Sequence, residues 1–351
     1  MGSGYPGCSK LEGMFLMAAL LALHLGPVSP SGPNRQPQLA AANGMVAMVF
    51  GSGDVIWFAR SGDNGRSFSA PVKVADLPKL SLGRHRGPRV AISGNTILVT
   101  AIRQQSDLFC WRSGDGGRTW SKGAVVNDQP TSAREGLDAL AADAEGHAAV
   151  AWLDDRTPKG KRLYGAFSDD RGATWSKNVM LYQSPSGTIC ECCHPSLVAL
   201  GGGEFAVMWR NVLDGSRDFY VMRVRGRPAS DAVKQGTGTW KLDACPMDGG
   251  GLAVRNGEIW SGWRREHDVY LAEPGKPEVK LGAGENIALA TTAKGAYAIW
   301  STPQGIEAQT PGSARQHLSQ SGGFPAIVAL PDGSVLAAWE ENGSIAVHRV
   351  E

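Results

Sequence analysis

The sequence has little that would direct it to a nucleic acid or to a membrane. Its net charge is only +2, and no run of lysine and arginine forms the concentrated basic face that nucleic-acid binding requires. No apolar run approaches the roughly 20 residues that a membrane-spanning helix needs, so we expect no such helix. Charged residues make up 19% and hydrophobic residues 42%, which argues against a disordered chain and indicates a large core.

The longest apolar run covers residues 14–25, about 12 residues, which suits the hydrophobic region of a signal peptide. Lys10 provides a positive charge before it, and Ser29 and Ser31 give the small-x-small pattern of a cleavage site. We therefore expect residues 1–31 to be an N-terminal extension and signal peptide, with translation starting at Met1 or Met14. The protein is then secreted or periplasmic. The alternative is a buried helix.

Three segments share the pattern S-x-D-x-G-x-[S/T]-[F/W], at residues 61–68, 113–120 and 168–175. We expect the Asp carboxylate to accept hydrogen bonds from backbone N–H groups across a tight turn, and the Gly to take a positive φ. The aromatic residue is expected to be buried under the hairpin. This pattern is the Asp box, or BNR repeat, and through it the sequence resembles the sialidase superfamily of β-propellers.

A larger unit repeats around the boxes. An apolar strand, a Gly turn and a second apolar strand recur seven times, starting near residues 37, 88, 137, 195, 251, 286 and 325. Apolar runs of this length between Gly and Pro indicate buried strands. With a third strand after each pair, the pattern predicts an all-β propeller of four-stranded blades, one domain over residues 32–351. Seven units differ from the six blades that the resemblance implies, so six remains the alternative. The last unit has no outer strand of its own, unless another part of the chain supplies it.

The resemblance implies a ligand site where the starts of the inner strands meet the loops between second and third strands. Sialidases hold the substrate carboxylate with three arginines, because a guanidinium matches a carboxylate with two parallel hydrogen bonds. The corresponding positions here are Arg86, Arg210 and Arg264. We therefore expect these three to bind an acidic sugar. The alternative is that they pair with nearby acids such as Asp214 or Glu266.

The catalytic residues of sialidases are matched less well. Those enzymes use a Tyr nucleophile activated by a Glu, together with an Asp general acid. This chain has Phe324 where the Tyr is expected. A pair of carboxylates could act instead, as in ordinary glycosidases. The candidates, among which no pair is favoured, are Glu135, Asp138, Asp154, Asp155 and Glu285.

Cysteines gather at one place in the sequence. Four of the six lie at the starts of two consecutive units, and Cys110 lies inside a strand, where a buried free thiol is expected. In an exported protein, neighbouring cysteines favour disulfides. The alternative is a metal site suited to copper or zinc. Its ligands would be Cys190, Cys192, Cys193, His194 and Cys245.

Three functions therefore remain open from the sequence. One is an exo-acting glycoside hydrolase for an acidic sugar, as the resemblance implies. Another is a non-catalytic propeller that binds a glycan or a protein at the same rim. A third is a metal-dependent or redox role of the cysteine cluster. The first two require no cofactor.

Overall fold

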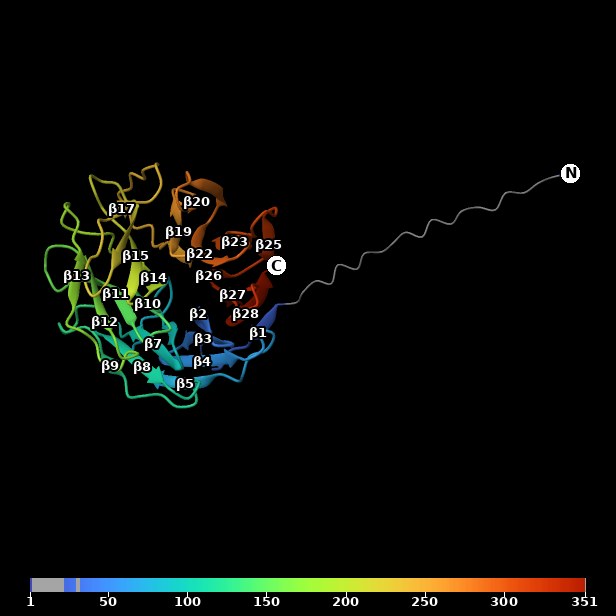
Figure 1. Ribbon diagram of the computed structural model, residues 1–351, viewed down its shortest axis with the longest axis horizontal. Coiled ribbons are helices and arrows are strands. Elements are labelled where there is room, and N and C mark those ends of the chain that lie inside the picture. Colours follow the sequence, from blue (N-terminus) through green and yellow to red (C-terminus); the bar gives the residue numbers. More distant parts are fainter. Residues whose placement is uncertain (2–21, 30–31, 351) are drawn as a thin grey trace.

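The computed structural model describes residues 1, 22–29 and 32–350, and within them it contains strands and turns but no helix. No helix that could cross a membrane is therefore found in the described part of the chain. The strands form seven four-stranded antiparallel sheets, arranged as blades around a ring (Figure 1). The seven-bladed propeller predicted from the repeats is confirmed, and the six blades of the alternative are wrong.

Each blade is ordered from the inner strand outward. Blade 1 contains β2 (Arg35–Ala42), β3 (Met45–Ser52), β4 (Val55–Ser61) and β5 (Val72–Asp76). Blade 2 contains β6 (Arg89–Ser93), β7 (Thr96–Ile102), β8 (Leu108–Ser113) and β9 (Ala124–Val125), and blade 3 contains β10 (Asp138–Ala142), β11 (Ala148–Asp154), β12 (Arg162–Ser168) and β13 (Val179–Tyr182). Blade 4 contains β14 (Ser196–Gly201), β15 (Glu204–Arg210), β16 (Phe219–Val224) and β17 (Val233–Lys234).

The remaining blades follow the same order. Blade 5 contains β18 (Gly251–Arg255), β19 (Glu258–Arg265), β20 (Asp268–Ala272) and β21 (Val279–Ala283). Blade 6 contains β22 (Glu285–Thr292), β23 (Gly295–Thr302), β24 (Gly305–Gln309) and β25 (Gln316–Ser319). Blade 7 contains β26 (Gly323–Ala329), β27 (Val335–Glu341), β28 (Ser344–Val350) and, as its outer strand, β1 (Leu23–Leu25).

The core lies between the blades. The inner strand of each blade contacts that of the next, and the contact of β26 with β2 closes the ring. The second strands supply the largest buried side chains, among them Trp152, Trp209, Trp300 and Trp339, each fully buried. Period-2 alternation alone would leave one face of each strand in water, but these strands are apolar on both faces because a blade packs against two neighbours.

The Asp boxes form the turns that the sequence predicts. In the second box, Asp115 Oδ1 accepts hydrogen bonds from the backbone N–H groups of Arg118 (2.9 Å) and Thr119 (3.0 Å). Gly117 takes a φ of 86°. The aromatic residue departs from the expectation: Trp120 is half-buried, packed edge-on against Phe58 of the preceding blade with ring centroids 5.3 Å apart. The box therefore joins two blades rather than filling the core of one.

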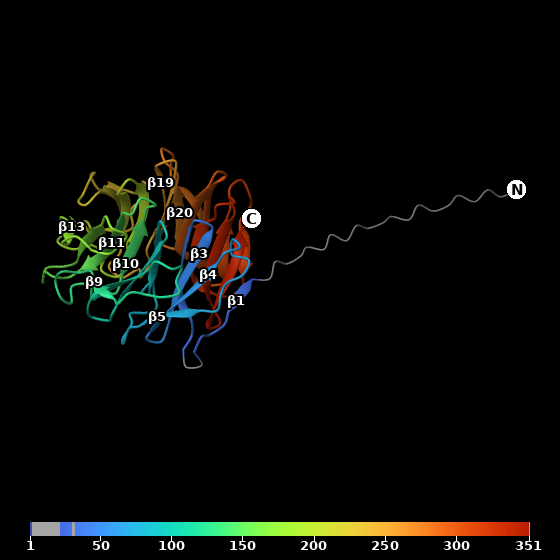
Figure 2. The same cartoon turned by 60° about the horizontal axis from the view of Figure 1, so that its bottom comes forward.

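The N-terminal segment closes the ring. Leu23–Leu25 pairs antiparallel with β28, where Leu23 lies opposite Val347 and Leu25 opposite Ile345. Figures 1 and 2 show β1 at the outer edge of the last blade, beside the C-terminus. The last unit thus takes its outer strand from the other end of the chain. Because β1 is the end of the apolar run of the predicted signal peptide, cleavage near Gly32 would remove it from the mature protein. Most of residues 1–31 lie outside the described residues, and the signal peptide stays a prediction.

Candidate functional site

A cavity of about 170 Å³ occupies the central channel, and the inner strands of all seven blades line it. Most of the residues that line it carry apolar side chains (alanine, leucine, isoleucine, valine and proline), but polar atoms form the larger part of its exposed surface. The polar side chains that line it are few: Gln38, His85, Arg89, His194, Ser196 and Asn286. A few polar side chains that converge among apolar residues are typical of a ligand site.

Two histidines stack at the centre of this site. The rings of His85, from the loop before β6, and His194, from the loop before β14, lie 4.2 Å apart between centroids, with planes 26° apart. His85 Nε2 lies 2.5 Å from Asn286 Oδ1, and the Phe324 ring packs edge-on against His85 at 5.2 Å. His194 Nδ1 is buried and has no hydrogen-bond partner among the described residues. The ring edge that carries this nitrogen lies close to Gly249.

The backbone around the channel mouth is held in an unusual conformation. Four residues there have a backbone φ between 52° and 65°, in the left-handed region that residues other than glycine rarely adopt. They are Gln36, His85, Asn286 and Phe324. At three of them the pairing of the inner strand is interrupted by a bulge. Strained backbone persists only where the surrounding structure holds it in place, and it is found most often at ligand and active sites.

Arg89 brings the positive charge to the cavity. Its Nε donates to the backbone oxygen of Asp138 (2.9 Å), and its Nη2 donates to that of His85. None of the hydrogen bonds of the described residues uses Nη1 of Arg89, which leaves this donor for a ligand. The carboxylate of Asp138 is itself buried and accepts a hydrogen bond from Thr100 Oγ1 at 2.7 Å. Burial raises the pKa of Asp138, although Arg89 opposes the shift.

The two histidines are neutral in the free protein at neutral pH. Burial lowers the pKa of His85 to about 4 and outweighs its contact with Asn286, while the charges of Arg89 and Arg86 lower it further. Burial also lowers the pKa of His194, and His85 and Arg89 add to this effect. An anion bound between them would favour protonation of both rings.

None of the three arginines expected to bind the ligand lines this cavity. Arg86 donates through Nε to the backbone oxygen of Glu135 at 2.7 Å. Arg210 is fully buried, stacked on Phe219 with 4.1 Å from its guanidinium carbon to the ring centroid. Its Nη2 donates to the backbone oxygen of Arg264, so these two arginines are neighbours. Arg210 therefore stabilises the contact between blades 4 and 5.

Arg264 is engaged by acids, as the alternative interpretation expected, but not by Asp214 or by the carboxylate of Glu266. Its Nη1 lies 2.7 Å from Glu285 Oε2 and 3.8 Å from Asp248 Oδ2. Its Nε donates to the backbone oxygen of Glu266. The three-arginine clamp remains a prediction, while the arginine that lines the cavity is Arg89, a residue the sequence analysis did not single out.

The candidate catalytic carboxylates are occupied by cations or buried. Asp154 accepts two hydrogen bonds from Arg156, at 2.9 Å each. Lys161 bridges the carboxylates of Glu135 (2.8 Å) and Asp155 (3.1 Å). Asp138 is buried and accepts a hydrogen bond from Thr100, and Glu285 forms an ion pair with Arg264. None of the five lines the channel cavity.

Asp248 is a further buried acid that the candidates omitted. Burial and the charge of Glu285 raise its pKa to about 7, against the opposing effects of Arg210 and Arg264. Its Oδ1 accepts a hydrogen bond from the backbone N–H of Asn286 at 3.1 Å. Its Oδ2 has no hydrogen-bond partner among the described residues. A carboxyl group that titrates near neutral pH can act as an acid or a base.

Among the described residues, no tyrosine lines the channel cavity. Tyr164, Tyr220 and Tyr270 lie in the third strands, where each ring centroid is within 6.5 Å of that of a tryptophan on the adjacent second strand. Phe324 lies at the mouth, as expected, and contacts His85 through its ring rather than offering a hydroxyl group.

The cysteines form a buried group without a disulfide. All five described cysteines are free, so the expected disulfides are not present among them. The sulfurs of Cys190, Cys192 and Cys193 lie within 4.8 Å of one another. His194 and Cys245 are outside this group: the ring of His194 points into the channel, and Cys245 is exposed. Cys110 is buried, as expected, which raises its pKa to about 12.

Comparisons with known proteins identify the fold. No protein-family model matches the sequence, and no curated protein matches it. Among solved structures, a Dyadobacter fermentans protein of unknown function aligns with a TM-score of 0.53 at 13% identity over 94% of this chain and 98% of its own. The leech intramolecular trans-sialidase aligns with a TM-score of 0.54 at 12% identity, over 94% of this chain and 69% of its own. The intramolecular trans-sialidase of Ruminococcus gnavus aligns with a TM-score of 0.53 at 11% identity, over 94% of this chain and 96% of its own. The chain has a sialidase-like β-propeller fold.

Proposed function

We propose that this protein binds an acidic sugar at the mouth of its central channel, without hydrolysing it. The observation that carries the proposal is the lining of the channel cavity. It brings together one guanidinium, two imidazoles and an amide, and the described residues that line it include no carboxylate and no tyrosine. An anion is favoured there, whereas the nucleophile and general acid of a glycosidase are not at hand.

The size of the cavity supports binding of one charged end of a ligand. Its volume of about 170 Å³ is smaller than the roughly 300–1,000 Å³ of pockets that enclose a drug-sized molecule. A carboxylate can enter to meet Arg89 Nη1 and the rings of His85 and His194, while the rest of the sugar lies over the mouth. The apolar faces of a sugar ring can pack against Phe324 there.

The structural neighbours agree with an acidic ligand. The leech enzyme is complexed with 2,7-anhydro-Neu5Ac, and the Ruminococcus gnavus enzyme with oseltamivir carboxylate. Both are ligands of a sialidase-like propeller that carry a carboxylate. Their enzymatic activity is not part of the proposal, because the arginine and tyrosine positions expected from sialidases are not assembled at this channel.

Hydrolysis is the second candidate, and one observation favours it. Asp248, with a pKa of about 7 and one oxygen without a hydrogen bond, lies next to Asn286, which lines the cavity. It has the properties of a general acid. A hydrolase would need this carboxyl group to reach the glycosidic oxygen above the channel.

One pair of assays separates the two candidates. The purified protein is applied to a glycan array that contains acidic sugars and their neutral counterparts, and it is incubated with fluorogenic sialosides. We expect retention on acidic glycans and no release of the fluorophore. Release that is abolished by Asp248→Asn would establish the hydrolase, and absence of binding to every acidic glycan would refute the proposal.

A further inference from the structure

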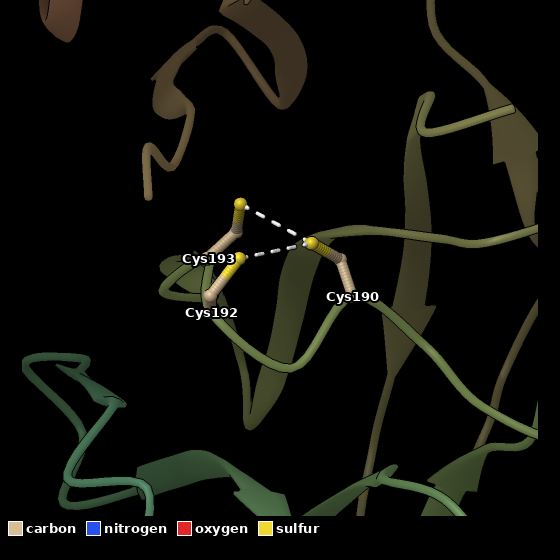
Figure 3. A group of neighbouring side chains, drawn as sticks. All are labelled: Cys190, Cys192 and Cys193. Atoms are coloured by element: carbon tan, nitrogen blue, oxygen red, sulfur yellow. Dashed lines mark hydrogen bonds between the residues drawn. The ribbon is translucent and has the colours of Figure 1, made fainter. Parts of the chain in front are cut away.

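The three buried cysteines before blade 4 are arranged as metal ligands. Cys190 Sγ lies 3.6 Å from Cys192 Sγ and 3.4 Å from Cys193 Sγ (Figure 3). Three sulfurs bound to one ion at about 2.3 Å would be separated by about 3.8–4.0 Å. Two of the three separations are therefore within a few tenths of an ångström of this range, and the third is no more than 4.8 Å. Figure 3 shows all three sulfurs on the same side of the loop.

Positive charge surrounds these sulfurs. Arg217 Nη1 donates to Cys190 Sγ at 3.2 Å, and the guanidinium of the buried Arg210 acts on Cys190 and Cys193 through its charge. Buried arginines are costly unless an anion compensates them. Arg210 makes hydrogen bonds to backbone oxygens, and its Nε has no partner among the described residues. Thiolates in the cluster would add negative charge beside Arg210, to which the buried carboxyl group of Asp248 also lies close enough to interact.

A thioether lies against the same group. Met247, from the loop that opens blade 5, packs on the three cysteines, and its backbone has a φ of 56°. A strained conformation at this position is consistent with a need to hold the side chain in place. The cluster therefore offers soft sulfur ligands in a buried setting, with no imidazole or carboxylate among the grouped atoms.

We propose that Cys190, Cys192 and Cys193 bind one Cu(I) ion through three thiolates. Soft thiolate and thioether ligands select Cu(I), whereas structural zinc takes four ligands in a tetrahedron. Charge favours the same ion: three thiolates and Cu(I) carry −2, which Arg210 and Arg217 neutralise. The thiol protons leave for solvent as the ion binds, and copper does not change its oxidation state. This site is separate from the proposed sugar site and does not depend on it.

The test is a competition titration of the full-length, reduced protein under anaerobic conditions. Cu(I) is supplied in the presence of a colorimetric Cu(I) chelator, and a parallel arm uses Zn(II) with a zinc indicator. We expect one Cu(I) per chain and weaker binding of Zn(II). Arg217→Met, which leaves every thiol in place, is expected to weaken Cu(I) binding by about 10–100-fold, as for other residues that support a metal ligand.

Matched cysteine variants locate the ion. Combined Cys190→Ser, Cys192→Ser and Cys193→Ser substitutions should abolish Cu(I) binding, while Cys8→Ser, Cys110→Ser and Cys245→Ser should retain it. Circular dichroism verifies that each variant folds. If the triple variant does not fold, the single Cys192→Ser variant is tested in its place. The proposal is overturned if the wild type binds no Cu(I), if the Cys192→Ser variant binds it as tightly, or if Zn(II) binds more tightly than Cu(I).

Discussion

The fold strongly alters the protonation of the two stacked histidines. His85 has its pKa lowered to about 4 in the folded protein, against 6.5 for an ordinary histidine. Between these values the unfolded chain binds a proton at this position that the folded chain does not. The contribution of His85 to stability is therefore complete above pH 6.5 and is lost as the pH falls toward 4.

This difference can be measured by urea unfolding at pH 7 and at pH 4.5. We expect the wild type to lose more stability over this range than the His85→Gln variant, by an amount that approaches roughly 3 kcal/mol. His267→Gln, which changes an exposed histidine, is the matched control and should behave as the wild type does. Equal losses for the wild type and His85→Gln would show that His85 is not held neutral by the fold.

Single residues of the site were also the hardest to predict. Arg89 lies in an apolar run of the sequence, at the start of a strand, and nothing local indicates that its side chain enters the channel. Its direction depends on the closure of the ring. The stacking of His85 on His194 likewise joins loops of blades 2 and 4. The rim arginines were identified by position, but their partners are set by contacts between blades.

At the scale of elements, the Asp boxes act at the contacts between blades. Trp120→Ala removes a half-buried ring that packs on Phe58, so we expect it to destabilise the protein by about 1–3 kcal/mol, less than the roughly 3–5 kcal/mol of a core tryptophan. Trp300→Ala, at a fully buried position, provides that reference. Denaturant unfolding gives both values. A larger loss for Trp120→Ala would show that the box fills a core after all.

The outer strand of blade 7 is the element with the largest expected effect per residue. Deletion of residues 1–26 removes β1 and exposes the edge of β28, which offers unpaired backbone groups to other chains. We expect a lower melting temperature and self-association, measured by calorimetry and size-exclusion chromatography. Deletion of residues 2–21, which keeps β1, is the control. Identical behaviour of both deletions would show that the ring closes without β1.

N-terminal sequencing of exported protein decides whether β1 is retained in the mature form. A start near Gly32 would support the predicted signal peptide and would leave the mature ring without the strand seen here. The sequence could not reveal this conflict, because three residues without a turn motif carry no signal of strand pairing with a partner at the other end of the chain.

At the scale of the whole molecule, repetition made the fold predictable and the function much less so. Each of the seven similar units forms one blade, and the blades must pack side by side because one unit cannot bury its apolar faces alone. The inner strands then meet at a channel, and any function there depends on side chains contributed by separate blades. Propellers of one fold carry different activities for this reason, so the site has to be argued from its own residues.

The central claim is that Arg89 and the channel histidines bind the carboxylate of a sugar. Its most direct test is a calorimetric titration of the wild type and the Arg89→Met variant with an acidic sugar and with its neutral methyl ester. We expect the wild type to bind the acid more tightly than the ester. Arg89→Met should bind it about 10–100-fold more weakly, the equivalent of one charge-assisted hydrogen bond, and bind the ester as before. Arg86→Met should match the wild type. Unchanged affinity of Arg89→Met for the acid would refute carboxylate binding by Arg89, and a loss only in Arg86→Met would place the site at the rim arginines.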